Sequence, residues 1–235
     1  MKGASAAEKH ARSGLLSNFI LGSQDGLVNV LGILLGLVAA TSDVRLIFVA
    51  ALAALGAESI SMGAVAYTST LARRKQYLKE VEREQQEMKE LPDKERQEVR
   101  EIFERWGYAG EQLERVTDVI VSNPRAWLEL MMAHELYLQP VDESEPRQSF
   151  TVVLTSTIVG SLIPLIPFFI STADLLADAV ASILLSGGVL FFVGYYEART
   201  TVGSLWRSGL QMALIGLAAG LAGFLIGHFI GAPAG

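Results

Sequence analysis

Long apolar runs occupy both ends of the chain and enclose one polar segment. A helix needs about 20 mostly apolar residues to cross the hydrocarbon core of a bilayer. Five runs reach that length, and they cover residues 15–40, 46–67, 150–170, 174–196 and 206–230. The pattern predicts an all-α membrane protein with five transmembrane helices and a helical insert between helices 2 and 3.

The chain therefore divides into three expected parts. Residues 1–72 hold the N-terminal tail and transmembrane helices 1 and 2, residues 73–147 form the insert, and residues 148–235 hold transmembrane helices 3–5. No proline or glycine separates the second apolar run from the charged residues that follow it. We expect one continuous helix to run from the second membrane span into the insert.

Prolines set the helix boundaries that we expect inside the insert. The residue before a proline is pushed out of the helical region, so the first insert helix ends near Leu91. Proline also starts helices well, and Asn is a favoured N-cap. These signals predict further insert helices over 92–105, closed by Gly107, over 111–121, and over 124–138. Pro164 and Pro167 predict a kink in the third transmembrane helix.

Composition agrees with a membrane protein and removes several kinds of chemistry. The chain has 235 residues, 51% of them hydrophobic, and a mean hydropathy of +0.36. It has no cysteine, which excludes disulfides, thiolate zinc sites and cysteine nucleophiles. A cleavable signal peptide has an apolar region of only about 7–15 residues. The first apolar run is longer and contains Asp25, so we expect it to be retained as a membrane helix.

Charge is concentrated in the insert, which holds 18 of the 25 acidic and 13 of the 19 basic residues. An acidic segment favours cations as partners and does not fit nucleic acid, which binds basic patches. Every Lys and Arg except Arg45 lies in the N-terminal tail, the insert or the loop after the fourth span. By the positive-inside rule, the N-terminus and the insert face the cytosol and the C-terminus faces the other side.

Acidic residues inside the membrane spans are candidates for an ion pathway. Asp25 lies about ten residues into the first span, about 15 Å along its axis, and Glu58 reaches a similar depth in the antiparallel second span. Met62 shares the face of Glu58 one turn later. Acids at such a depth are costly and mark ion or proton pathways by default. The alternative is that each acid is capped by a neighbouring Ser, Asn or backbone group.

Two further membrane features have more than one interpretation. Glycines 22, 26, 32 and 36 form small-residue patterns in the first span that let a partner helix approach closely, which is an unspecific indication of a dimer. Asp174 and Asp178 lie four residues apart at the outer end of the fourth span. They form either a cation exit or a pair of solvated interfacial acids.

In the insert, acidic and methionine residues recur at helical spacing. Residues three or four apart share a helix face, so short helices can direct these side chains into one gap. The candidate metal ligands are Glu84, Glu87, Glu95, Glu98, Met131, Met132 and Glu135. The alternative is an ordinary solvated face with salt bridges, with the methionines used for packing.

Five blocks in order resemble the vacuolar iron transporter family. They are residues 25–28 (DGLV), 59–63 (SISMG), the glutamate-rich insert, 127–135 (WLELMMAHE) and 163–167 (IPLIP). The resemblance implies a homodimer of five-span subunits that moves ferrous iron, and often other divalent metals, out of the cytosol in exchange for protons. It puts Asp25 and Met62 on the translocation pathway at the dimer interface, and the seven insert candidates on the cytoplasmic metal site.

One position departs from the family pattern. Family members often carry a glutamate one turn before Glu58, where this chain has Ala54. Glu58 can substitute from the next turn, or proton coupling differs in this chain.

We therefore predict a transporter of ferrous iron and other divalent transition metals, manganese among them, with the metals as substrates and no prosthetic group. It is not an enzyme, and its partners are the lipid membrane, metal ions, protons and a second copy of the chain. A chain without a targeting extension is expected in a prokaryotic cytoplasmic membrane, with a vacuolar membrane as the alternative.

Three other functions are set against transport. A ferroxidase needs Glu-x-x-His pairs, and His134 has Met131 three residues before it. A membrane-anchored metal sensor or scaffold would bind metal without flux, and a proton-independent cation channel would show flux without need of a pH gradient.

Overall fold

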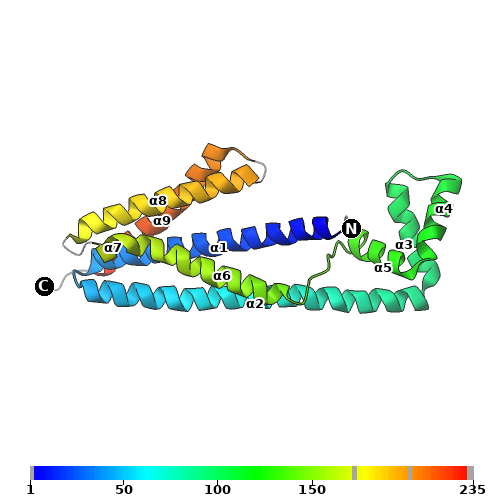
Figure 1. Ribbon diagram of the computed structural model, residues 1–235, viewed down its shortest axis with the longest axis horizontal. Helices are drawn as coiled ribbons and strands as arrows, with labels where there is room; N and C mark the ends of the chain where they lie inside the picture. Colours follow the sequence, from blue (N-terminus) through cyan, green and yellow to red (C-terminus); the bar gives the residue numbers. More distant parts are fainter. Residues whose placement is uncertain (1–2, 171–173, 201–202, 232–235) are drawn as a thin grey trace. The chain divides into compact units, whose positions relative to one another are not determined.

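The computed structural model describes residues 3–170, 174–200 and 203–231, with side chains from Gly14 onward (Figure 1). Every regular element in these ranges is helical. The elements are α1 (Gly3–Ala40), α2 (Val44–Glu90), α3 (Pro92–Arg105), α4 (Gly110–Val121), α5 (Pro124–His134), α6 (Glu145–Leu162), the 3₁₀ turn η1 (Ile163–Leu165), α7 (Ile166–Ile170), α8 (Leu175–Thr200) and α9 (Leu205–Ile230).

Within the described residues, five helical segments are long and apolar enough to cross a membrane, as the sequence predicts. They are Gly14–Ala40, the α2 helix, Glu145–Ile170, Leu175–Thr200 and Leu205–Ile230. Helix α1 starts before the predicted residue 15, at Gly3. The added turns include Ala4, Ala6 and Ala7, and alanine is the strongest helix former.

Helix α2 is continuous from Val44 to Glu90, which confirms that no break follows the second span. The chain divides into two compact units whose boundary falls within this helix. We call Met1–Tyr67 together with Arg147–Gly235 the membrane unit, and Thr68–Pro146 the insert unit.

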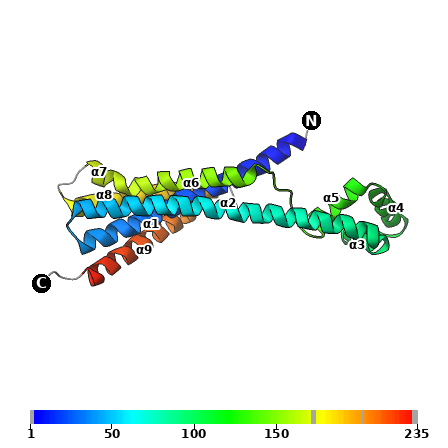
Figure 2. The same ribbon diagram turned by 90° about the horizontal axis from the view of Figure 1, so that it is seen from below.

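In the membrane unit, α1 packs against α8 and α9 (Figure 2). Its core combines side chains of α1, α2, η1, α7 and α8. The fully buried members include Val30, Leu34, Ile47, Leu165 and Phe168. In a bilayer such contacts hold helices together by close van der Waals packing, because lipid tails are as apolar as these side chains.

The glycines of the first span serve contacts within the chain. A Cβ at Gly26 would meet the Ser161 hydroxyl of α6. A Cβ at Gly36 would lie 2.9 Å from the carbonyl oxygen of Gly223 in α9, and a Cβ at Gly227 would overlap the carbonyl oxygen of Gly36. Because their partners are α6 and α9 of the same chain, these glycines give no support to a dimer.

The predicted kink in the third span takes the form of the 3₁₀ turn η1. Pro164 lies in this turn and has no N–H to continue the α-helical hydrogen bonds. Its carbonyl accepts a 2.8 Å hydrogen bond from the hydroxyl of Ser182 in α8. The broken helix is therefore held to α8 by a polar contact.

The insert unit has its own apolar core. Val99, Ile102 and Phe103 of α3 pack there with Leu113 of α4 and with Trp127 and Met131 of α5. Arg96 of α3 joins α4 through Glu114, at 3.0 Å, and Asp118, at 2.7 Å. The predicted N-cap of α5 is confirmed, because the Asn123 side chain accepts from the backbone N–H of Arg125 and Ala126 at 3.1 and 3.3 Å.

The last insert helix ends earlier than predicted, at His134 and not at 138. The N–H of Leu136 reaches back to the carbonyl of Met131 at 3.2 Å, and that of Leu138 to the carbonyl of Met132 at 2.9 Å. Tyr137 has φ = 54°, in the left-handed region that usually takes glycine or asparagine. The sequence carries no such residue there, so the stop could not be seen in it.

Candidate metal centre

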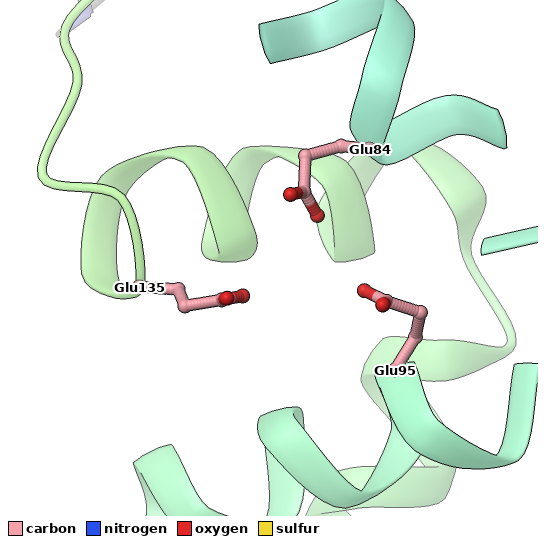
Figure 3. Close-up of side chains that lie close together, drawn as sticks. All are labelled: Glu84, Glu95 and Glu135. Atoms are coloured by element: carbon pink, nitrogen blue, oxygen red, sulfur yellow. The ribbon is translucent and has the colours of Figure 1, made fainter. Parts of the chain in front are cut away.

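Three glutamates from three segments of the insert unit converge on one point (Figure 3). Glu84 comes from α2, Glu95 from α3, and Glu135 from the residue that follows α5. Each offers a carboxylate oxygen, and these oxygens all lie within 4.8 Å of one another. They are three of the seven ligands that the sequence predicts.

Local sequence explains how the three side chains come together. Pro92 ends α2, because Leu91 leaves the helical region at φ −130° and ψ 50°. Glu84 therefore lies shortly before the turn, and Glu95 lies in the first turn of α3 just after it. Glu135 is the C-cap residue of α5. The apolar core of the insert unit then fixes α3 and α5 relative to each other.

The carboxylate oxygens of the three glutamates are largely removed from water. Glu84 is 1% exposed and Glu95 0% exposed. Among the described residues, no hydrogen bond reaches Oε2 of Glu84, either oxygen of Glu95 or Oε2 of Glu135, all of which are buried. An unpaired buried polar group costs about 1–3 kcal/mol, and more when it is charged. A bound cation would offset this cost.

Burial and mutual repulsion make these groups hold protons more tightly. Burial, supported by the neighbouring carboxylate of Glu98, raises the pKa of Glu95 and of Glu135 to about 7. Burial also raises the pKa of Glu84, and the carboxylate of Glu87 adds to that shift. Near neutral pH the cluster therefore exchanges protons readily, which suits a site where a metal ion displaces them.

Glu87 and Glu98 lie at the edge of the cluster and are half-buried. Glu98 forms a 2.8 Å ion pair with Lys94, and Glu87 a 3.5 Å ion pair with Arg83. The same two cations also approach the inner glutamates, Lys94 to Glu95 at 3.6 Å and Arg83 to Glu84 at 3.5 Å. Arg83 and Lys94 were not predicted from the sequence, although their i, i+4 spacing to Glu87 and Glu98 was a visible signal.

The two methionines are both buried. Met131 packs in the apolar core of the insert unit beside Val99, Ile102 and Trp127. Met131 therefore has the packing role that the sequence left open as an alternative for these methionines.

The donor set fits a divalent metal ion held by oxygen atoms. Carboxylate oxygens bind such ions at about 2 Å, so opposed ligands lie about 4 Å apart. The observed spacing reaches this value with small side-chain movements. Three carboxylates without cysteine or histidine leave coordination positions for water, and such an open site can release its ion.

The membrane acids also lie together. Asn29 of α1 donates a hydrogen bond to Oε1 of Glu58 in α2, and the Asp25 carboxyl interacts electrostatically with Glu58. Asp25, Glu58 and Met62 are each half-buried. Glu58 is thus partly capped by an asparagine, as the alternative interpretation held. Asn29 was not among the predicted pathway residues, although it lies one turn after Asp25 on the same helix face.

Comparison with known proteins covers both units of the chain. The VIT family model matches residues 16–228. Vacuolar iron transporter 2 of Oryza sativa subsp. japonica is 34% identical over 219 residues, which span 92% of this chain and 88% of that protein. Vacuolar iron transporter 1 of Arabidopsis thaliana is 31% identical over 224 residues, spanning 95% and 89%. The vacuolar iron transporter of Plasmodium falciparum (isolate 3D7) is 28% identical over 220 residues, spanning 90% and 81%.

Proposed function

Because the chain belongs to the VIT family, we propose that it carries ferrous iron, and other divalent transition metals such as manganese, out of the cytosol in exchange for protons. It is a multi-pass membrane protein of a family of metal-ion transporters, so metal ions are its substrates. The observation that carries the proposal is the convergence of the buried Glu84 and Glu95 with the half-buried Glu135. Among the described residues, each of the three has at least one buried carboxylate oxygen without a hydrogen-bond partner.

The insert would act as the site of metal capture. Its carboxylates are held in place by helices, so little ordering is needed when an ion binds. The surrounding acidic residues attract cations and raise their local concentration. Arg83 and Lys94 are partly exposed and pair with the outer glutamates. They hold the site less negative when it is empty and can turn to solvent when an ion enters.

Asp25, Glu58 and Met62 would form the step inside the membrane. Two carboxylates accept a divalent ion well, and a thioether favours transition metals over magnesium and calcium. The Asn29 amide orients Glu58. Protonation from the far side would neutralise these acids and release the metal, which couples the two fluxes.

The orientation and the assembly belong to the same proposal. Basic residues near the span ends support a cytosolic insert. Asn29 is exposed on a membrane-spanning helix that also exposes Leu21 and Ile33. A polar group facing lipid is costly, and this supports a second copy of the chain as its cover in a homodimer. The relatives are named for vacuoles, and a prokaryotic cytoplasmic membrane stays our prediction for this chain.

The test is metal uptake into proteoliposomes with and without an imposed pH gradient. We expect the gradient to accelerate uptake by wild type. Asp25→Asn should lower gradient-driven uptake at least tenfold, about 1.4 kcal/mol, and leave metal binding by the insert within twofold. Asp43→Asn is the matched control, because Asp43 is exposed and only caps α2 by accepting from the N–H of Arg45 at 2.9 Å.

Other outcomes select other functions. Metal binding without uptake would indicate a sensor or scaffold, and uptake that ignores the gradient would indicate a channel. Oxygen consumption with ferrous iron would indicate a ferroxidase. The His134 ring lies edge-on to the Trp106 ring, with centroids 4.9 Å apart, which favours a packing role for this histidine.

A further inference from the structure

A buried acid in the fourth spanning helix has no part in the sites above. Asp178 lies in the first turn of α8 and is 5% exposed. Among the described residues, its Oδ2 atom has no hydrogen-bond partner and its carboxylate forms no ion pair. A lone acid inside a spanning segment marks an ion or proton pathway by default, because its burial is otherwise uncompensated.

Its neighbour Asp174 shows the contrasting, structural role. Asp174 is exposed, and its side chain accepts from the backbone N–H of Leu176 and Ala177 at 3.0 and 3.2 Å. It is the N-cap of α8, and no ligand is needed to explain it. Of the two acids that the sequence offered as a cation exit, only Asp178 lacks a structural explanation.

Asp178 begins a column of polar side chains on the buried face of α8. Ser182 and Ser186 follow at successive turns, and both are fully buried. The Ser182 hydroxyl donates to the carbonyl of Pro164 in the broken helix, and the Ser186 hydroxyl has no partner among the described residues. In membrane proteins, broken helices next to unpaired polar groups are where ions and protons are bound.

The elements packed against α8 supply little charge. Both η1 and α7 pack against α8, and neither contains a titratable residue. Helix α7 lies beside the start of α8 in Figures 1 and 2. The only titratable residue of α1 from Gly14 onward is Asp25, which interacts with Glu58. Helix α9 contributes Arg207 and His228, both exposed. The residue next to Asp178, Ala179, packs in the apolar core.

This chemistry suits a proton and does not suit a metal. A divalent transition metal needs several strong ligands, whereas the column offers one carboxylate, hydroxyls and a backbone carbonyl. A proton needs only the carboxylate. We propose that Asp178 binds the proton exchanged for metal, and that Ser182 and Ser186 extend its polar surroundings into the membrane unit.

The inference rests on the proposed proton exchange, and the position of Asp178 agrees with it. In the predicted topology the third span leaves the cytosolic side, so α8 begins on the far side of the membrane. Protons that drive metal export from the cytosol arrive from that side. Asp178 is then the first buried acid that they reach on α8.

The experiment measures metal uptake and proton movement together, in proteoliposomes that contain a pH-sensitive dye. We compare wild type, Asp178→Asn and the control Asp174→Asn, which keeps a capping side chain. For Asp178→Asn we expect metal-driven proton movement to fall at least tenfold and its pH profile to flatten. Downhill metal uptake without a gradient should stay within twofold of wild type, and Asp174→Asn should match wild type in every measurement.

Three results would overturn the inference. If Asp178→Asn keeps the wild-type ratio of protons to metal, the exchange stands and Asp178 is not its carrier. If wild type itself moves no protons with the metal, the proposed function fails and the inference fails with it.

If Asp178→Asn does not assemble, Ser186→Ala replaces it, because that hydroxyl has no partner to lose. We expect a loss of proton movement and a changed pH profile, and an unchanged pH profile would reject the column.

Discussion

At the scale of single residues, the feature that matters most is a set of carboxylates placed where they repel one another. Glu95 is fully buried, faces Glu84 and Glu135, and has no hydrogen bond on either oxygen. Folding the insert without metal therefore carries an electrostatic cost, and metal binding at the proposed site would offset it. Replacing one of these residues should therefore weaken metal binding and raise the stability of the metal-free protein.

Glu95→Gln tests this opposition. Removing one of the three proposed ligands should weaken metal binding at least tenfold, about 1.4 kcal/mol. The metal-free protein should unfold at a higher temperature, because one buried carboxylate that repels its neighbours is gone. Calorimetric titration with metal and thermal unfolding are the two measurements. Glu101→Gln on the exposed side of α3 is the control and should change neither.

Metal affinity should depend on pH around neutrality. The pKa of Glu95 and Glu135 in the folded protein is about 7, above the usual 4.5. The folded, metal-free state thus binds extra protons between these values. The contribution of these two groups to its stability is therefore greatest below about pH 4.5 and is lost as the pH rises through 7.

Metal affinity should instead increase as the pH rises, because the carboxylates proposed as ligands must lose those protons before they bind metal. Affinity should rise about tenfold or more from pH 6 to pH 7.5, and binding should release protons that a weakly buffered titration can count. Glu95→Gln should flatten the pH dependence. Affinity that stays level across this range would show that Glu95 and Glu135 are not ligands.

At the scale of elements, helix ends and helix contacts depend on different kinds of information. Single residues set two of the helix boundaries, Pro92 at the start of α3 and Asn123 at the N-cap of α5, and both were predicted. The continuous α2 was predicted as well. The end of α5 depends on Tyr137 in the left-handed region, which only the fold imposes. The helices that contact the α1 glycines could not be predicted either. A small residue indicates that another helix packs closely against it, but it does not identify that helix.

The contact between α1 and α9 gives a prediction at this scale. Gly227→Ala would place a Cβ onto the carbonyl oxygen of Gly36, so the helices must move apart and the protein should lose about 2 kcal/mol or more of stability. Gly187→Ala in α8 is the control, since nothing lies within 4 Å of its Cβ position. This change should be neutral or stabilise by about 1 kcal/mol. Thermal unfolding in detergent measures the stability of both variants. Equal unfolding temperatures for Gly227→Ala and Gly187→Ala would refute the close contact.

At the scale of the whole molecule, two units with separate cores imply two unfolding transitions. The core of the membrane unit is built from α1, α2, η1, α7 and α8, and that of the insert unit from α3, α4 and α5. Metal capture is proposed for the insert unit and translocation for the membrane unit. Metal should therefore act on one transition and leave the other unchanged.

Saturating metal should stabilise the insert unit alone. At a hundredfold excess over Kd the gain is about 2.7 kcal/mol, which for a small domain raises the midpoint by roughly 10 °C or more. Trp106 and Trp127 report on the insert unit in a Trp206→Phe variant, and circular dichroism reports on both units. A metal chelator should reverse the shift. An equal shift of both transitions would argue against a metal site confined to the insert.

The sequence by itself determined the helices, the five spans and the set of candidate acids, because apolar run length, proline and asparagine signals and i, i+3 spacing act within a few residues of one another. Only the tertiary structure decided which carboxylates face a common point, since that depends on how the chain turns at Leu91 and stops after His134. It also separated Asp178, buried without a partner, from Asp174, which caps its helix four residues earlier. Burial and pairing arise from contacts between distant segments, and a local pattern does not contain them.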